Sequence, residues 1–329
     1  MFKKNKILGM AKRVLLPFRD WEQSRFDNGR LYLPRVYVKQ LGTMHRVILR
    51  VIQESPQYLF ELEQIEPSPY QIERHGQRVS FCCNICGSMN TDVTMDIVSN
   101  REAASCGTCH SSLRMRSVIN ALSVELFGEH IQLPAFPDSK NIIGMGLSDW
   151  EGYAMRLKNK LSYINTFYHQ EPRLDITNIP DDEIGKYDFI ISSDVMEHIP
   201  YKDLGKAFTN MRRLLKSGGF LLLTVPYKPD GDTDEYYPDL YDFKFITTKE
   251  KTFLYNRTVA GVEQIFDNLV FHGGGGFTLE MRMFSESGLL KILDDNGFAG
   301  GARIYRDNDE KYGIVWPISW AVPVVARKV

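Results

Sequence analysis

Apolar and polar positions alternate in two different ways along this chain, and the change falls near residue 140. From Lys140 onward, short apolar runs alternate with helical patterns, which is typical of a parallel α/β sheet. Helices are predicted at 202–215, where apolar residues share one face, and at 285–296, which begins at a Ser cap. The predicted strands cover residues 141–148, 163–167, 187–193 and 220–225, with final candidates at 302–306 and 321–327.

Before residue 140 the pattern is less regular. One clear amphipathic helix is predicted, because apolar residues recur at helical spacing from Met115 to Leu126 and Gly128 follows as a stop. Residues 20–80 contain two plausible helices, one of them around 43–52. Residues 66–70 predict an extended linker, since each proline there biases its predecessor away from helix.

Composition changes this picture only at the amino terminus. The 329 residues allow a domain of about 200 residues plus a smaller module. A formal net charge of −1 argues against a protein built mainly to coat nucleic acid. Residues 1–19, however, carry six Lys or Arg and no acid. Their apolar stretch is too short to span a bilayer and makes a poor signal peptide, so we expect a cytoplasmic protein. This segment either rests on an anionic membrane surface or is a tail or helix packed on the body.

Four of the five cysteines form two C-x₂-C pairs, Cys83 with Cys86 and Cys106 with Cys109, separated by nineteen residues. Each pair can aim two thiolates at one point, and four sulfurs satisfy the tetrahedral coordination of Zn²⁺. Two disulfides are the alternative, although a chain of this kind more often keeps its thiols reduced. Because a Cys₄ set leaves no open position for substrate, the predicted zinc has a structural role. Only Cys82 falls outside the pattern.

The stretch from Lys186 to Pro226 resembles the core of class I S-adenosylmethionine-dependent methyltransferases, of the type 11-like group. KYDFIISSDVMEHIP is followed by a helix and then by RRLLKSGGFLLLTVP, at that family's spacing. IIGMGLSD occupies the position of the family's glycine loop, and RLDITNIPDD resembles its adenine-lining segment. The paired cysteines before such a domain are similar to zinc-ribbon methyltransferases associated with glycan-biosynthesis genes.

The resemblance implies a Rossmann-like seven-stranded sheet preceded by an amino-terminal helical segment and a zinc ribbon. The expected boundaries are 1–78 for the helical and linker region, 79–112 for the ribbon, 113–139 for the connecting helix and 140–329 for the methyltransferase domain. Within that last domain, residues 226–284 are expected to form a substrate insertion.

The same resemblance implies which residues hold S-adenosylmethionine. Two departures from the family pattern stand out: Ile142 replaces a frequent acid before the first glycine, and Ser148 replaces a frequent third glycine. No acid ends the second strand, so either Asn165 or Glu171 takes the ribose, or ribose is held differently. The expected cofactor-binding residues are Gly144, Met145, Gly146, Asn165, Asp175, Ile176, Ser192, Ser193 and Asp194.

His198 is the candidate catalytic residue, and Glu197 directly precedes it. A His beside a Glu near the methyl donor can act as a general base, and the alternative is that both residues orient the loop and the following helix. In the insertion, tyrosines and carboxylates suit hydroxyl-rich or amine-bearing ligands. The alternative for this acidic stretch is a solvated loop with a hairpin. The candidate substrate residues are Tyr236, His272, Glu280 and Arg282.

We therefore expect an enzyme that transfers a methyl group from S-adenosylmethionine to a small-molecule or sugar and glycan-precursor acceptor. A zinc-ribbon RNA methyltransferase and a non-catalytic methyltransferase-like scaffold are the alternatives. Nucleic acid is the less favoured partner, because the insertion is rather acidic. The sequence does not specify an oligomeric state.

Overall fold

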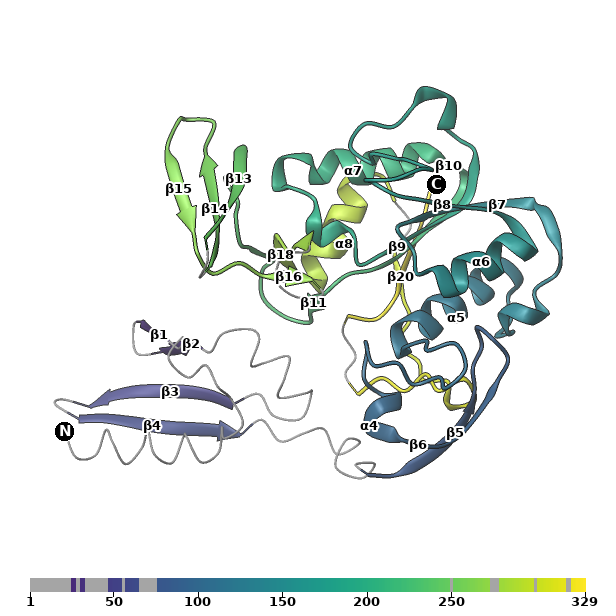
Figure 1. The fold of residues 1–329 in the computed structure, drawn as a ribbon, viewed down its shortest axis with the longest axis horizontal. Coiled ribbons are helices and arrows are strands. Elements are labelled where there is room, and N and C mark those ends of the chain that lie inside the picture. The colour runs from purple at the N-terminus through teal and green to yellow at the C-terminus, as the bar shows by residue number, and fades with distance from the viewer. Residues whose placement is uncertain are drawn as a thin grey trace. The chain divides into compact units, whose positions relative to one another are not determined.

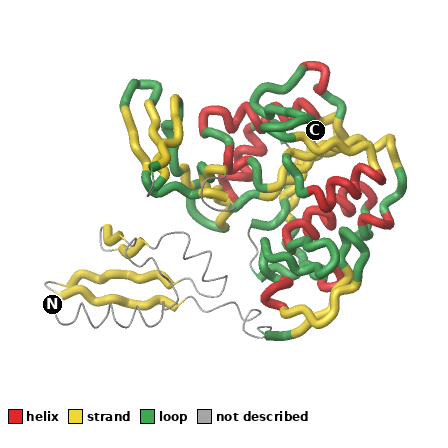
Figure 2. The backbone as a smooth tube through the Cα atoms, in the orientation of Figure 1, coloured by secondary structure: helices red, strands yellow, loops and turns green. Residues whose placement is uncertain are grey.

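The computed structural model describes residues 25–27, 30–32, 47–54, 57–64, 76–248, 251–272, 278–298, 301–317 and 321–329. The chain divides into two compact units, Met1–His75 and Gly76–Val329 (Figures 1 and 2). The basic segment 1–19 and the linker 66–70 lie outside the described residues. A membrane contact of residues 1–19 therefore stays a prediction.

The described part of the first unit is a sheet of four antiparallel strands in the order β1-β2-β3-β4. The strands are β1 (Arg25–Asp27), β2 (Arg30–Tyr32), β3 (Val47–Glu54) and β4 (Gln57–Gln64). The helix predicted around 43–52 is therefore wrong over 47–52, where β3 pairs with β4 from Val47 to Glu54. Val47, Ile48, Val51 and Ile52 are β-branched and lose side-chain freedom in a helix, so the segment is better suited to a strand. The amino-terminal helical segment is not confirmed.

The second unit is built around a mixed sheet of six strands in the order β19-β20-β10-β9-β7-β8. β7, β8, β9 and β10 run parallel, and β20 is antiparallel to both of its neighbours. The expected Rossmann-like sheet is present with six strands among the described residues, and a seventh strand is not confirmed. The strands are β7 (Ser139–Leu147), β8 (Leu161–Thr166), β9 (Tyr187–Ser193), β10 (Leu215–Thr224), β19 (Arg303–Ile304) and β20 (Val324–Arg327).

The segment after β8 shows why a seventh strand is missing beside it. The carboxylate of Asp175 accepts hydrogen bonds from the backbone N and the hydroxyl of Thr177, at 2.9 and 2.7 Å. Such a local side-chain bond turns the backbone away from a strand ladder. Only an isolated bridge between Phe167 and Arg173 remains at this edge of the described sheet.

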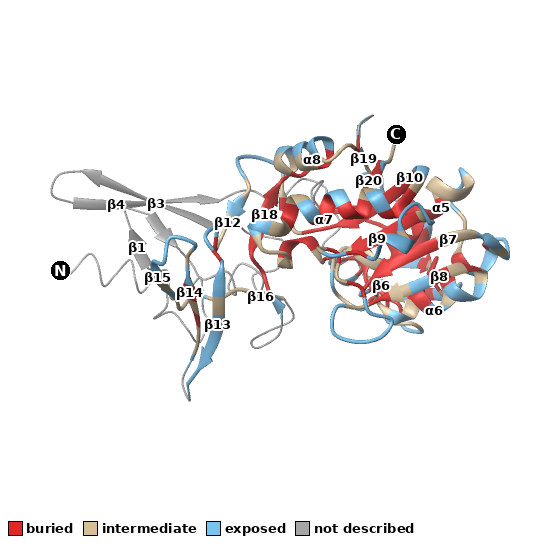
Figure 3. Cartoon of the chain, turned by 90° about the horizontal axis from the view of Figure 1, so that it is seen from above, coloured by how far each residue is buried: buried red, intermediate tan, exposed pale blue. Residues whose placement is uncertain are grey.

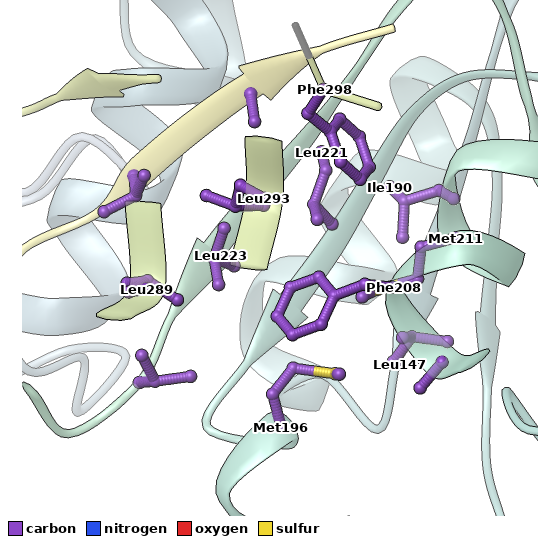
Figure 4. Packing of buried hydrophobic residues seen from close by; sticks show 14 of the residues in the cluster. Leu147, Ile190, Met196, Phe208, Met211, Leu221, Leu223, Leu289, Leu293 and Phe298 are labelled. Atoms are coloured by element: carbon purple, nitrogen blue, oxygen red, sulfur yellow. The ribbon is translucent and has the colours of Figure 1, made fainter. Parts of the chain in front are cut away.

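Helices cover both faces of this sheet (Figure 1). β8 lies on one side of β7 and β10 on the other side of β9, so right-handed crossovers place α6 (Glu151–Lys160) and α7 (Tyr201–Leu214) on opposite faces. Figure 4 shows the α7 side, where Phe208 and Met211 pack with Ile190, Leu221 and the α8 (Glu286–Asp295) residue Leu293. Figure 3 shows the buried residues concentrated in the central strands and in α7.

The three helices predicted from periodicity are confirmed within two residues. α5 (Leu113–Phe127) begins at Ser112, whose hydroxyl accepts a hydrogen bond from Met115 N, and ends at Gly128 in the left-handed conformation. α8 begins at Ser285, whose hydroxyl accepts from Gly288 N. Short helices are α4 (Met95–Val98), η3 (Leu133–Ala135), η4 (Asp181–Glu183), η5 (Met196–His198) and η6 (Glu310–Tyr312).

The cysteine ribbon and the insertion each add small sheets to the second unit. In the ribbon, β5 (Arg78–Cys82) pairs with β6 (Met89–Thr94) around the first cysteine pair. The insertion has a small core of its own formed by Tyr237, Leu240, Leu254, Leu279 and Met281. Its strands are β11 (Tyr227–Lys228), β12 (Asp234–Glu235), β13 (Asp242–Thr247), β14 (Thr252–Arg257), β15 (Glu263–Phe266), β16 (Phe271–His272), β17 (Thr278–Leu279) and β18 (Arg282–Ser285). Within the described residues, no helix combines the length and the apolar character that crossing a bilayer requires.

Candidate functional site

The four paired cysteines meet at one point. Cys83 Sγ lies 3.6 Å from Cys109 Sγ, Cys86 Sγ lies 3.7 Å from Cys106 Sγ, and all four sulfurs lie within 4.8 Å of one another. A tetrahedral zinc with Zn–S bonds of about 2.3 Å needs sulfurs about 3.8 Å apart. The hydrogen bond between Cys83 and Cys109, together with burial, raises the pKa of the Cys83 thiol to about 12. A bound cation would lower this pKa again. All five cysteines are free thiols, and the donor set fits a closed metal site.

A fully buried arginine ties this cluster to the rest of the unit. The Arg116 guanidinium donates to the hydroxyl of Ser105 and to the carbonyls of Ser111 and Gly313, at 2.8, 3.0 and 2.9 Å. Burial lowers the pKa of Arg116 to about 10, and the neighbouring thiols of the cluster favour its charged form. A tetrathiolate zinc centre carries excess negative charge, which this cation would offset.

The carboxyl ends of the parallel strands form the edge where an α/β sheet binds ligands. β7 stands between β8 and β9, so the chain reverses its direction of winding between β7 and β9. In the structure, a side chain at Gly144 would collide with the ring of Phe189, and one at Gly146 with Tyr163 and Asp149. The two glycines therefore make room for the domain's own side chains.

Asp149, just beyond the glycine loop, is the buried acid of this edge. Tyr163 donates a short hydrogen bond to its carboxylate, and its backbone exchanges hydrogen bonds with the side chain of Asn165 at 2.9 Å. Burial raises the pKa of Asp149 to about 7. Two buried polar atoms along this edge, Asp149 Oδ1 and Ser192 Oγ, make no hydrogen bond with any described residue, and the buried Tyr153 hydroxyl interacts with Asp149 and Ser193 without full hydrogen-bond geometry.

The raised pKa of Asp149 predicts a stability that falls as the pH rises from about 4 to about 7. In this window the folded protein keeps a proton that the unfolded chain, with a carboxyl pKa of about 3.9, has released. Asp149→Asn should flatten the dependence and stabilise the protein at pH 8 by on the order of 4 kcal/mol. Urea unfolding at pH 5 and pH 8 measures both effects. Asp182→Asn, at an exposed position of η4, is the control, and an unchanged pH slope in Asp149→Asn would contradict the assignment.

Two arginines from outside the sheet hold Asp194, which follows β9. Arg101, between the cysteine pairs, binds both Asp194 carboxylate oxygens at 2.9 and 2.7 Å. Arg114, in the first turn of α5, lies 3.1 Å from Asp194 and donates to the Ser193 hydroxyl at 2.6 Å. Glu102 also binds Arg114, with oxygens at 2.9 and 2.8 Å. We call Arg101 and Arg114 the arginine clasp; it joins the cysteine ribbon to the end of β9.

The turn η5 is held by the insertion through three consecutive contacts. Arg282 donates to the carbonyl of Met196 at 2.6 Å, and the backbone N of Met281 donates to the carbonyl of Glu197 at 2.8 Å. His198 Nδ1 lies 2.8 Å from the carbonyl oxygen of Leu279. Glu197 is fully buried, and burial raises its pKa well above the usual range, with a further contribution from Asp194.

Comparison with known families matches a methyltransferase domain to residues 41–300. The chain belongs to this methyltransferase family. The predicted enzyme class is thereby confirmed. No curated protein matches the sequence.

The solved structures that match this methyltransferase have low identity to it. The 1,6-didemethyltoxoflavin-N1-methyltransferase of Burkholderia thailandensis is 12% identical, with a TM-score of 0.36 over 66% of this chain and 77% of that one. The sugar N-methyltransferase KedS8 from Streptoalloteichus is 12% identical, with a TM-score of 0.36 over 66% and 87%. The amino pentose methyltransferase CalS10 from Micromonospora echinaspora is 12% identical, with a TM-score of 0.36 over 67% and 92%.

The predicted cofactor residues of the methyltransferase fall into two groups. Gly144, Gly146, Asn165, Ser192, Ser193 and Asp194 come together along the carboxyl ends of β7, β8 and β9. Met145 and Ile176 instead belong to the buried hydrophobic core. Asp175 is engaged with Thr177, and Glu171 is exposed and accepts a hydrogen bond from Arg173 N at 3.0 Å.

The predicted substrate residues are not all at a surface. Arg282 is fully buried and pairs with Glu235 at 2.7 Å, and its hydrogen bond to the Met196 carbonyl holds the insertion to η5. Glu280 retains 2% exposure. Tyr236 joins the same region through its backbone N, which donates to the carbonyl of Met281 at 2.8 Å. For His272 the structure describes the backbone alone, which pairs with Thr278 in β16–β17.

Sequence reasoning missed the clasp and the buried acid. Arg114 was visible as a polar position on a predicted helix, and Asp149 as the acid directly after the glycine loop. Arg101 had no comparable signal, because its partner Asp194 lies 93 residues further along the chain.

Proposed function

We propose that this methyltransferase transfers a methyl group from S-adenosylmethionine to a small-molecule or sugar acceptor, and that the cysteine ribbon holds a structural zinc. The observation that carries the proposal is the set of buried polar atoms without hydrogen bonds at the switch point between β7 and β9. Such atoms are costly unless a ligand satisfies them.

The residues at this edge fit the cofactor. Asp149, Asn165 and Ser192 would offer acceptors and donors to its polar groups. When bound, S-adenosylmethionine supplies a methyl group on a positively charged sulfur. The chain itself supplies alignment, which is the main demand of an in-line displacement. The arginine clasp fixes the end of β9, and the insertion fixes η5 next to it.

A small acceptor suits the insertion better than RNA. Between residues 226 and 284 there are ten Asp or Glu and six Lys or Arg. A surface of that balance lacks the positive potential that single-stranded nucleic acid requires.

We expect S-adenosylhomocysteine to bind saturably in isothermal titration calorimetry. Ser192→Ala should weaken that binding about five- to hundredfold without lowering thermal stability, because the Ser192 hydroxyl makes no hydrogen bond within the described residues. Ser162→Ala is the control: it lies at the amino end of β8, where its hydroxyl donates to the carbonyl of Lys140, away from the proposed site. Absence of binding at millimolar ligand would overturn the proposed function.

A further inference from the structure

The carboxylate of Glu197 is the feature of this edge that the fold itself leaves unsatisfied. Its side chain has 0% exposure, and neither oxygen has a hydrogen-bond partner among the described residues. Glu197 lies in η5, which follows the end of β9. Burial favours the protonated form of this carboxyl group in the empty site, and a ligand that brings donors and positive charge would stabilise its carboxylate form.

The arginines near Glu197 are engaged with other acids. Arg101 and Arg114 bind Asp194 and Glu102, and Arg282 binds Glu235. The base nearest to Glu197 in the described structure is His198, whose Nε2 lies 3.7 Å from Glu197 Oε1. Asp194 and Glu280 add negative potential at the Glu197 carboxylate, while Arg101 opposes them.

The contact of His198 with Leu279 sets its tautomer. A backbone carbonyl only accepts hydrogen bonds, so Nδ1, 2.8 Å from Leu279 O, carries the proton. In the neutral ring, Nε2 is then the basic nitrogen, and it is the one nearest to Glu197. The His198 side chain keeps 13% exposure, whereas the Glu197 side chain keeps none. A ligand would therefore reach the two residues from the side of His198.

We propose that the acceptor of this methyltransferase is an amine, whose ammonium form binds the Glu197 carboxylate and gives one proton to His198 Nε2. The inference rests on the proposed function and names its substrate class. An ammonium brings both the donors and the positive charge that Glu197 lacks, whereas a hydroxyl brings a donor alone.

The reaction balances with these two residues. The amine nitrogen loses one proton to His198, forms one bond to the transferred methyl carbon and becomes a methylated ammonium. The donor leaves as a neutral thioether that keeps the bonding pair, and His198 releases its proton to solvent. The acid proton of Glu197 is released to solvent when the ammonium binds, and its carboxylate then stays beside a positive nitrogen before and after the transfer.

Matched ligands test the proposal by binding in the presence of saturating S-adenosylhomocysteine. The probes are glucosamine with glucose and galactosamine with galactose, free and as 1-phosphates, titrated by calorimetry. We expect each amine to bind at least tenfold more tightly than its hydroxyl partner, and Glu197→Gln to remove the preference while leaving S-adenosylhomocysteine affinity unchanged. Glu263→Gln, at an exposed position of β15, is the matched control.

The outcomes separate this inference from the proposed function. If S-adenosylhomocysteine does not bind the parent, the proposed function fails and this inference falls with it. The amine assignment alone is overturned if S-adenosylhomocysteine binds the parent and one of three results follows. Hydroxyl ligands bind as tightly as amines, no member of a pair binds, or Glu197→Gln keeps the preference for amines.

His198→Gln gives a second readout with labelled S-adenosylmethionine. We expect a rate loss of about 10²–10⁴ near pH 7, shrinking as the pH approaches the pKa of the acceptor amine, where the base is no longer needed. A deficit that is independent of pH would show that His198 only packs the turn.

Discussion

Cys106→Ser is expected to destabilise the whole Gly76–Val329 unit by several kcal/mol and to weaken S-adenosylhomocysteine binding in the same variant. Loss of one thiolate removes metal-linked folding free energy. The sequence alone suggests that this variant destabilises the amino-terminal half more than it alters S-adenosylmethionine affinity. In the structure, however, the cysteine ribbon belongs to the same compact unit as the methyltransferase sheet.

The arginine clasp is the reason that cofactor affinity should change. Arg101 lies between the two cysteine pairs, and its two hydrogen bonds to Asp194 fix the end of β9. When the ribbon unfolds, Asp194 loses this partner and keeps Arg114 and the hydroxyl of Thr224, which leaves the charge of a buried carboxylate less well compensated. Chelation of the metal should therefore act on the sheet edge as well as on the ribbon.

Elemental analysis should give about one zinc per chain in the parent and less in Cys106→Ser. Chemical denaturation and calorimetry with S-adenosylhomocysteine then measure stability and affinity. Cys82→Ser is the matched control, since this neighbouring cysteine is outside the cluster of four. A metal-free parent that is fully folded, or a Cys106→Ser variant with normal affinity, would contradict the coupling.

The sequence predicted the parts of the fold whose signal is local. β9 spans Tyr187–Ser193 as expected, because a continuous apolar run bounded by polar residues is typical of a strand buried on both faces. α7 and α8 followed from apolar periodicity, and α8 from its Ser cap as well. The four paired cysteines could be assigned because spacing alone brings their sulfurs together.

Other parts depend on contacts that a local pattern does not contain. Val47–Glu54 is a strand because Gln57–Gln64 pairs with it. Asp149 is buried because Tyr163, on the next strand, covers its carboxylate. Arg101 and Asp194 meet only after the cysteine ribbon docks on the sheet, so the composition of the site could not be predicted from the loops of the α/β domain alone.

Gly144→Val is expected to prevent normal folding of the methyltransferase sheet. Gly144 is among the cofactor-binding residues that the family resemblance implies. In the structure, a Cβ at Gly144 would run into the Phe189 ring, which is fully buried and stacks between Tyr163 and Phe220 with centroids 5.9 Å from each. Because β7 is paired with β8 on one side and with β9 on the other, neither the backbone at Gly144 nor the Phe189 ring can move freely. Overpacking of this kind costs about 3 kcal/mol or more.

Two further variants make the prediction for Gly144 specific. Gly205→Ala, in the interior of α7 with its nearest neighbour atom at 4.0 Å, should be neutral or stabilise by up to about 1 kcal/mol. Gly144→Val combined with Phe189→Ala should recover part of the lost stability, because the double variant removes the colliding ring. Urea denaturation compares all three with the parent. A Gly144→Val protein that folds with normal stability but fails to bind S-adenosylhomocysteine would restore the cofactor role, since the glycine would then serve the ligand and Phe189 would have room to move.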